Sequence, residues 1–313
     1  MPSEPFPDAL RNPLLKYFLA TRPAFLPVTL FAALVGLASA AYSGIELSLA
    51  TSVVTVSFAL VAHAGINVLN DYYDDLNGSD RNNEDRLFPF TGGSRFIQNG
   101  VLTREAMARF GVSLFFAVIA AGLWLAQRSG AGLLAIGAAG LAIGWAYSAP
   151  PLKLNGRGIG ELCVAAGFAL IAVGADYVQR RGFHLLPLAA ASCYALLVAN
   201  ILYINQFPDY RADAAAGKRH WVARLGPQRA RWGYVAIAAL AYVALAAFVA
   251  AQVLPTGALS GLAGAPLSAG AALDLARRAR RPRELAPAIK MTIAAACVNG
   301  LLVSLALFLA PPR

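Results

Sequence analysis

The stretch HAGINVLNDYYDDLNGSDRNNEDRLFPFTGGSRF, residues 63–96, decides how the rest of the sequence is interpreted. It begins inside an apolar segment and then places six acidic residues within fifteen positions, although the whole chain has only 16 Asp and Glu. The six are Asp71, Asp74, Asp75, Asp80, Glu84 and Asp85. Ionisable groups gathered at the end of a membrane helix are functional candidates by default, and carboxylates predict a cation site.

Composition places this site in a membrane protein. The chain has 313 residues, 58% of them hydrophobic and 13% charged, whereas a soluble domain is about 25% charged. Apolar segments long enough to cross a bilayer recur along the chain. We therefore expect an all-α polytopic membrane protein with nine transmembrane helices. The predicted spans are 23–42, 48–70, 103–127, 131–149, 159–179, 184–206, 229–252, 256–275 and 286–310.

Lysine and arginine, 26 in all, are divided unequally between the two sides of this arrangement. All but five of them are predicted on the side of the N-terminus. Of these five, Arg109 lies inside the third span, and the other four lie on the opposite side: Arg128, Arg180, Arg181 and Arg313. Because positive charge marks the cytoplasmic side, we expect a cytoplasmic N-terminal segment 1–22 in an inner-membrane protein. The acidic stretch then faces the cytoplasm and the C-terminus faces outward. The net charge of +10 is thus a topology signal, and no nucleic-acid partner is expected.

Two halves of the chain resemble each other. The second predicted span ends in NDYYDDLNGSD (70–80) and the sixth ends in NQFPDYRAD (205–213), and a basic polar loop follows each. A four-span unit used twice, over about 23–149 and 159–275, with a ninth helix appended, accounts for this spacing. We expect one domain, residues 23–313, built around a central cavity.

The two acidic motifs predict a magnesium site. In the second, Asn205, Asp209 and Asp213 are spaced so that a helix places them on one face. In the first, the spacing leaves two registers open. These are Asn67–Asp71–Asp75 and Asn70–Asp74–Gly78. Two such faces that meet would form an oxygen-rich cage, and hard oxygen ligands suit Mg²⁺, which commonly bridges carboxylates to substrate phosphate.

Positive partners for a phosphate are also present. Arginine outnumbers lysine 22 to 4, yet Lys153 and Lys218 both lie within the polar motifs, and a lysine ammonium is a compact charge for a phosphate oxygen. Tyr147 precedes a Pro-Pro pair, where an aromatic ring serves either as an interfacial residue or as a shield for a carbocation. Further cationic candidates are Arg22, Arg95, Arg157 and Arg219.

Together these residues resemble the UbiA-type intramembrane prenyltransferases, a superfamily with nine transmembrane helices, and most closely their 1,4-dihydroxy-2-naphthoate polyprenyltransferase branch. Asp80 fits that branch, whereas Gly78 departs from the broader superfamily. Gln206 and Pro208 depart from the branch's usual NNxRDxxxD pattern. The matching stretches are NDYYDDLNGSD (70–80), TGGSRFIQNGVLT (91–103), YSAPPLKLNGRGIGELCV (147–164) and NQFPDYRADAAAGKRHWVARLG (205–226).

The resemblance implies Mg²⁺-dependent transfer of a polyprenyl group from its diphosphate to an aromatic acceptor, most closely 1,4-dihydroxy-2-naphthoate. It implies metal ligands at Asn70, Asp71, Asp74, Asp80, Asn205, Asp209 and Asp213. Diphosphate contacts are implied at Arg22, Lys153, Lys218, Arg95 and Arg157, and direct catalytic roles at Asp74, Asp209, Lys153 and Tyr147.

Two other functions stay open at this level. One is prenyl transfer to another acceptor, such as 4-hydroxybenzoate, homogentisate, a tetrapyrrole or a glycerol phosphate lipid. The other is a membrane transporter, for which polar motifs and repeats are also expected. A transporter binds its substrate near mid-span, whereas here the carboxylates gather at one interface, which favours the enzyme.

Overall fold

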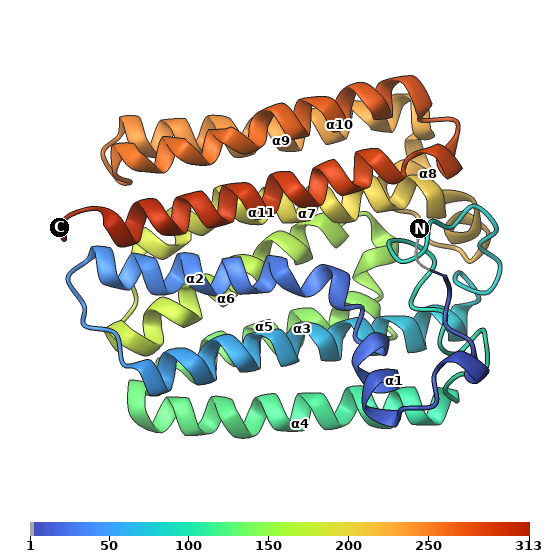
Figure 1. The fold of residues 1–313 in the computed structure, drawn as a ribbon, viewed down its shortest axis with the longest axis horizontal. Coiled ribbons are helices and arrows are strands. Elements are labelled where there is room, and N and C mark those ends of the chain that lie inside the picture. The colour runs from blue at the N-terminus through green and yellow to red at the C-terminus, as the bar shows by residue number, and fades with distance from the viewer. Residues whose placement is uncertain (1–2) are drawn as a thin grey trace.

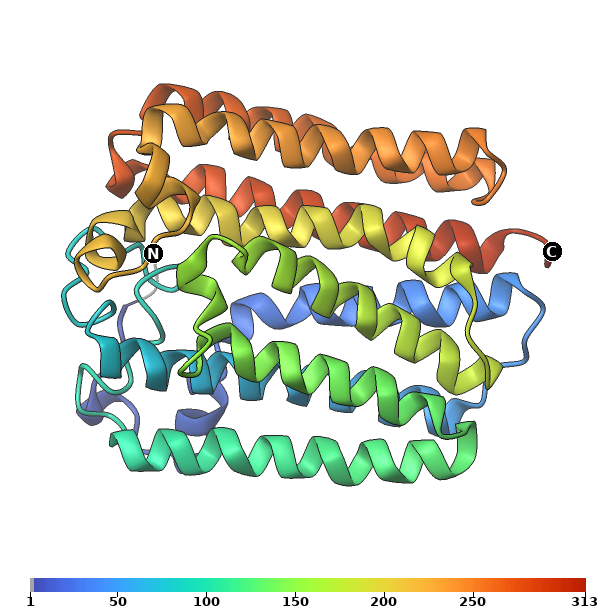
Figure 2. The same ribbon diagram turned by 180° about the vertical axis from the view of Figure 1, so that it is seen from behind.

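A computed structural model describes residues 3–313. Within that range the chain consists of helices and loops, with no strand, as the all-α prediction requires. The long helices lie side by side along the longest axis, with α1, α8 and the long polar loops at one end and the C-terminus at the other (Figures 1 and 2). The α-helices are α1 (Pro13–Ala20), α2 (Leu26–Tyr42), α3 (Leu49–Asn77), α4 (Arg104–Ser129), α5 (Gly132–Ser148), α6 (Gly160–Arg180), α7 (Leu185–Ala215), α8 (Trp221–Leu225), α9 (Pro227–Ala250), α10 (Ala265–Arg278) and α11 (Ala286–Leu309).

A helix occupies each of the nine predicted ranges. Eight of them are long and apolar enough to cross a membrane. Two of these eight are counted together with a preceding 3₁₀ helix, Pro23–Phe25 before α2 and Thr256–Gly264 before α10. The ninth, α5, is apolar but has only 17 residues, which at 1.5 Å per residue gives about 26 Å. The chain is therefore a multi-pass helical membrane protein.

The two helices that carry the acidic motifs are longer than the predicted spans. The spans were expected to end at positions 70 and 206, but α3 continues to Asn77 and α7 to Ala215. Pro208 lies inside α7 and does not end it, although proline removes one intrahelical hydrogen bond. The carboxylates of both motifs up to Asp75 and Asp213 are therefore mounted on continuous helices rather than on loops.

Helix α7 forms the centre of the bundle and is the most buried of the long helices. Helix α2 packs against α6 and α11, and at one point this packing depends on Gly36. A Cβ atom there would lie 2.1 Å from the carbonyl oxygen of Ala172, so only glycine permits this approach.

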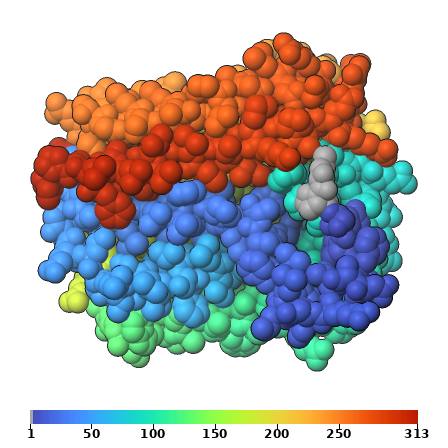
Figure 3. Space-filling view, viewed as in Figure 1, coloured from blue at the N-terminus to red at the C-terminus, as the bar shows by residue number. Residues whose placement is uncertain are grey.

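The outer helices present apolar side chains outward. On α4 the exposed side chains of Val112, Phe116, Ile119 and Leu123 recur at helical spacing and form one stripe. Figure 3 shows a continuous surface over α11, α2 and α3, with the N-terminal segment covering one end. An apolar stripe on the outside of a helical bundle is typical of a protein surrounded by lipid.

Candidate active site

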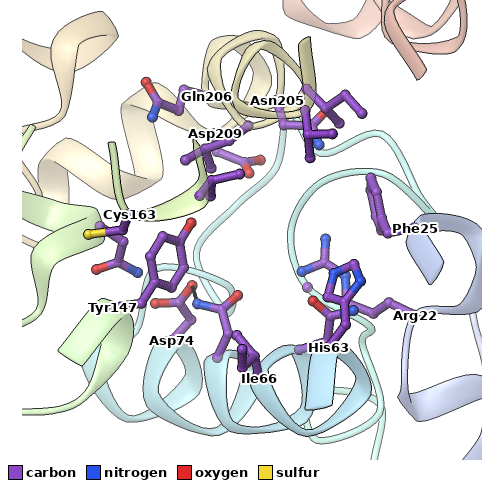
Figure 4. A pocket seen from close by; sticks show the side chains of 18 of the residues that line it. Arg22, Phe25, His63, Ile66, Asp74, Tyr147, Cys163, Asn205, Gln206 and Asp209 are labelled. Carbon is purple, nitrogen blue, oxygen red and sulfur yellow. Dashed lines mark hydrogen bonds between the residues drawn. The ribbon is translucent and has the colours of Figure 1, made fainter. Parts of the chain in front are cut away.

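One cavity of about 230 Å³ brings the two acidic motifs together. Asp74 and Asp80 from the first motif, and Asp209 and Asp213 from the second, line one part of it, with Lys218. The rest of its wall is largely apolar and includes Phe25, Val28, Ile66, Ile143 and Phe168. Figure 4 shows Asp74 on α3 and Asp209 on α7 facing the same space. A charged part and an apolar part of one cavity suit an amphipathic ligand.

Lys218 connects the two motifs directly. Its Nζ atom lies 2.9 Å from Asp74 Oδ1 and 2.9 Å from Asp213 Oδ1. The second Asp213 oxygen lies 3.2 Å from Nε2 of His220, which begins α8. Lysine can reach both carboxylates because α7 ends at Ala215 and the chain turns back through Gly217 at φ +84°. A cation therefore already bridges the two acidic helix ends.

Amide side chains hold two more carboxylate oxygens of the site. Asn70 donates to Asp74 Oδ2 at 3.1 Å and to Ser148 Oγ at 2.9 Å, which ties α3 to the end of α5. Asn83, in the loop after α3, donates to Asp209 Oδ1 at 2.5 Å. Each motif is thus oriented by residues from other elements, as a preorganised site requires.

Asp71 and Asp80 approach each other on either side of Gly93. Asp71 Oδ2 accepts from the Ser94 N–H at 3.0 Å, and its Oδ1 lies 3.7 Å from Arg22. A Cβ at Gly93 would lie 2.2 Å from Asp80 Oδ2 and 3.3 Å from Asp71 Oδ1. Glycine at φ +73° is therefore required twice, for its backbone angle and for its missing side chain.

The structure separates the two registers that the first motif left open. Asn67, Asn70 and Asp74 line the cavity. Asp75 is turned away, and its carboxylate pairs with Arg104 and, at 3.5 Å, with Arg81. Asp71 contacts Ser94 and Arg22 instead of lining the cavity. Both registers therefore contribute, because the wall of the cavity covers more than one row of side chains on α3.

The second motif lies on one face, as its spacing predicts. Asn205, Asp209 and Asp213 all line the cavity. Gln206, which departs from the branch pattern, also lines it and donates to Glu161 Oε1 at 2.7 Å. Gln206 is thereby held by α6 rather than by the carboxylates.

The predicted diphosphate ligands fall into three groups. Arg22 and Lys218 line the cavity. Arg95 is buried and supports the loop from behind, because its Nη1 donates to the backbone oxygen of Asp80 at 2.5 Å. Lys153 and Arg157 are exposed and outside the lining, and Arg157 donates to Pro151 O at 2.7 Å. Tyr147 does line the cavity, with its ring beside Asp74 (Figure 4).

Burial and charge act together on two titratable groups of the site that lie outside the membrane-spanning helices, Asp80 and Lys218. Burial, and then the negative charges of Asp74 and Asp71, raise the pKa of the Asp80 carboxyl well above its usual value. Burial opposes the charged form of Lys218, but the carboxylates of Asp213, Asp74 and Asp80 together hold its pKa well above the usual value. The site therefore favours added positive charge.

The oxygen atoms of this site are of the type that binds a divalent cation. Asp71 Oδ1, Asp80 Oδ2 and Asn205 Oδ1 are buried oxygens without a hydrogen-bond partner in the described structure, and such oxygens are the ligands that Mg²⁺ prefers. Within residues 3–313, no three His, Cys, Asp or Glu side chains are close enough together to hold an ion by themselves. The fit is that of an ion bound by a few protein oxygens together with a ligand, which is the usual mode for Mg²⁺.

Sequence reasoning missed three residues that hold the site together: Asn83, Ser148 and His220. Their partners are Asp209, Asn70 and Asp213, which lie far from them in sequence in the first two cases. The available signal for His220 was its place seven residues after Asp213. For Asn83 and Ser148 no spacing rule applies, because the contacts depend on the fold of the loop and on helix packing.

Comparisons with known proteins identify relatives over most of the chain. A 1,4-dihydroxy-2-naphthoate octaprenyltransferase of Mycobacterium tuberculosis is 34% identical over 254 residues, which cover 80% of this chain and 82% of that protein. The Escherichia coli protein of the same name is 27% identical over 295 residues, covering 92% and 93%. These relatives confirm the predicted resemblance to the 1,4-dihydroxy-2-naphthoate polyprenyltransferase branch.

Solved structures give the same fold. A UbiA homologue from Archaeoglobus fulgidus superposes with a TM-score of 0.61 at 18% identity, covering 94% of this chain and 100% of that one. A structure of that homologue bound to GPP and Mg²⁺ also gives 0.61, at 17% identity and with 92% and 99% covered. The model of the UbiA prenyltransferase family matches residues 29–306. With nearly the whole membrane domain matched, this chain belongs to the UbiA prenyltransferase family.

Proposed function

We propose that the chain transfers a polyprenyl group from a polyprenyl diphosphate to an aromatic acceptor, and that the acceptor is 1,4-dihydroxy-2-naphthoate, as in menaquinone synthesis. The observation that carries the reaction class is the single cavity with both acidic motifs in one part and an apolar wall in the other. Naphthoate as acceptor is supported by the names of the relatives from Mycobacterium tuberculosis and Escherichia coli.

The charged part of the cavity suits the diphosphate head. Asn70, Asp71, Asp74, Asp80, Asn205, Asp209 and Asp213 are the residues that would hold Mg²⁺. When bound, the ion supplies positive charge that stabilises a departing diphosphate. Lys218 and Arg22 line the same space and would bind the phosphate oxygens directly. Because Lys218 is shared by Asp74 and Asp213, phosphate binding would draw it away from at least one of them.

The apolar part suits the reacting carbon and the chain behind it. Departure of diphosphate from an allylic carbon leaves a cation, which water would quench unless the site excludes it. Tyr147 presents an aromatic face to the cavity beside Asp74, and such a face attracts cations. An acceptor ring carbon then forms the new bond to the prenyl carbon, and the ring loses a proton or, with the naphthoate acceptor, its carboxyl group as CO₂.

We further propose nine membrane crossings, with the short helix α5 as the fourth. The cavity and the basic loops would face the cytoplasm from an inner membrane. The C-terminus lies at the opposite end of the bundle (Figure 1), so it would face outward. Accessibility labelling of single cysteines placed at residues 100 and 313 in intact cells tests this orientation.

The function is tested with purified protein in detergent, Mg²⁺, prenyl diphosphates of several lengths and a panel of aromatic acceptors, read by product mass. We expect one prenyl group to be added, with loss of CO₂ when the acceptor is 1,4-dihydroxy-2-naphthoate. Product formed only with another acceptor would refute the naphthoate assignment. No product with any acceptor, from a protein that binds prenyl diphosphate, would refute the proposed reaction.

A further inference from the structure

His63 lines the cavity between its apolar wall and Arg22. It lies on α3 eleven residues before Asp74, which is about 16 Å along the helix from that carboxylate. Its Nδ1 atom shares a hydrogen bond of 2.6 Å with Thr29 Oγ1 on α2. Its ring meets the Phe168 ring of α6 edge to face, with centroids 5.6 Å apart. Three helices therefore fix the position of one imidazole.

The other ring nitrogen of His63 has no such partner. In the described part of the chain, the hydrogen bond to Thr29 uses only Nδ1, and the geometry of an imidazole directs Nε2 away from that contact. Figure 4 shows His63 at the cavity wall near Arg22 and Phe25, across from Tyr147. A ligand that supplies a hydrogen-bonding group at this part of the cavity would give Nε2 the partner that the protein does not provide.

The two substrates differ in whether they can supply that group. A prenyl chain is a hydrocarbon and offers no hydrogen-bonding atom beyond its diphosphate, for which Lys218 and Arg22 are the proposed partners. An aromatic acceptor carries hydroxyl oxygens on its ring. Phe25 and Phe168 line the same region, and their rings provide flat apolar surfaces on which another ring can pack.

We infer that His63 is the residue that positions the aromatic acceptor, by a hydrogen bond between Nε2 and a ring hydroxyl. This inference rests on the proposed prenyl transfer and adds the subsite that the acceptor occupies. Thr29 supports it by fixing the ring through Nδ1. Since His63 lies deeper than the carboxylates, the acceptor extends from the reacting prenyl carbon toward the middle of the bundle.

The test compares His63→Phe with His63→Gln by steady-state kinetics in both substrates. Phenylalanine keeps a flat ring and removes the nitrogen, so we expect KM for the acceptor to rise about tenfold, while KM for prenyl diphosphate stays within about twofold. Glutamine keeps a hydrogen-bonding group and is expected to recover part of the loss. An acceptor analogue that lacks the bound hydroxyl is expected to react equally with the wild type and His63→Phe.

Two results would overturn the inference. One is an unchanged acceptor KM in His63→Phe, and the other is a rise in KM for prenyl diphosphate alone, which would assign His63 to that substrate. If His63→Phe does not fold, Thr29→Val, which keeps the side-chain shape and removes the support of Nδ1, is measured in the same way. Failure of the proposed function is a separate result, because the wild type would then form no prenylated aromatic product.

Discussion

Gly93→Ala tests whether the position of the Asp80 carboxylate controls activity. The added Cβ would lie 2.2 Å from Asp80 Oδ2, whereas ordinary contacts begin near 3.4 Å, so the carboxylate or the loop must move by about 1 Å. A displacement of about 1 Å in a catalytic site can reduce the rate about 10²-fold. We expect a loss of that size in prenyl transfer, measured as product mass per unit time in detergent.

Gly100→Ala provides the matched control. Gly100 is in the same loop and has nearly the same backbone angle, φ +70° against +73°, but nothing lies within 4 Å of its added Cβ. Both substitutions carry the cost of a left-handed alanine, about 1 kcal/mol, and only Gly93→Ala adds the contact with Asp80. If the two variants have the same activity within twofold, the role assigned to the Asp80 position is wrong.

Three more predictions follow from the same contacts. Asp74→Asn or Asp209→Asn is expected to lower turnover at least about 10²-fold, while the far-UV circular dichroism spectrum stays unchanged. Full activity in either variant would show that the substituted residue is not a metal ligand. Lys218→Met leaves Asp74 and Asp213 without their shared counter-charge and is expected to lower the free energy of unfolding by about 3 kcal/mol, with Mg²⁺ restoring part of it; an unchanged thermal midpoint would contradict this. The pKa of Asp80 is raised in the folded protein, so the folded protein keeps a proton on this carboxyl that the unfolded chain releases at lower pH. Without metal, the contribution of Asp80 to the free energy of unfolding therefore falls as pH rises through the raised pKa. Mg²⁺ replaces that proton and is expected to stabilise the protein more at high pH than at low pH; equal thermal shifts at both would argue against it.

The helices were predictable because hydrocarbon thickness sets their length. Each of the nine ranges read from hydropathy holds a helix, since in lipid the backbone must satisfy its hydrogen bonds internally. The ends were less predictable, because α3 and α7 continue into polar sequence, where hydropathy no longer marks the helix. The expectation that both acidic motifs lie together followed from topology, which places even-numbered connections on one side.

Side-chain directions in loops could not be read from the sequence. Lys153 and Lys218 were equivalent candidates, yet Lys218 is buried between two carboxylates and Lys153 is exposed. Lys218 follows a helix whose last turn already lies at the site, so its reach is short. Lys153 follows two prolines that end α5, and the direction of the chain beyond them depends on contacts elsewhere. Asn83 was missed for the same reason.

The loops after α3 and α7 explain how four carboxylates can share one cavity. Alone, the two acidic helix ends would repel each other in a medium that screens charge weakly. Each is instead neutralised or hydrogen-bonded by the loop of the other: Lys218, after α7, pairs with Asp74 on α3, and Asn83, after α3, bonds Asp209 on α7. The exchange makes either motif incomplete without its partner. A polar loop after each acidic helix is therefore part of the site itself, which accounts for its presence in both halves of the chain.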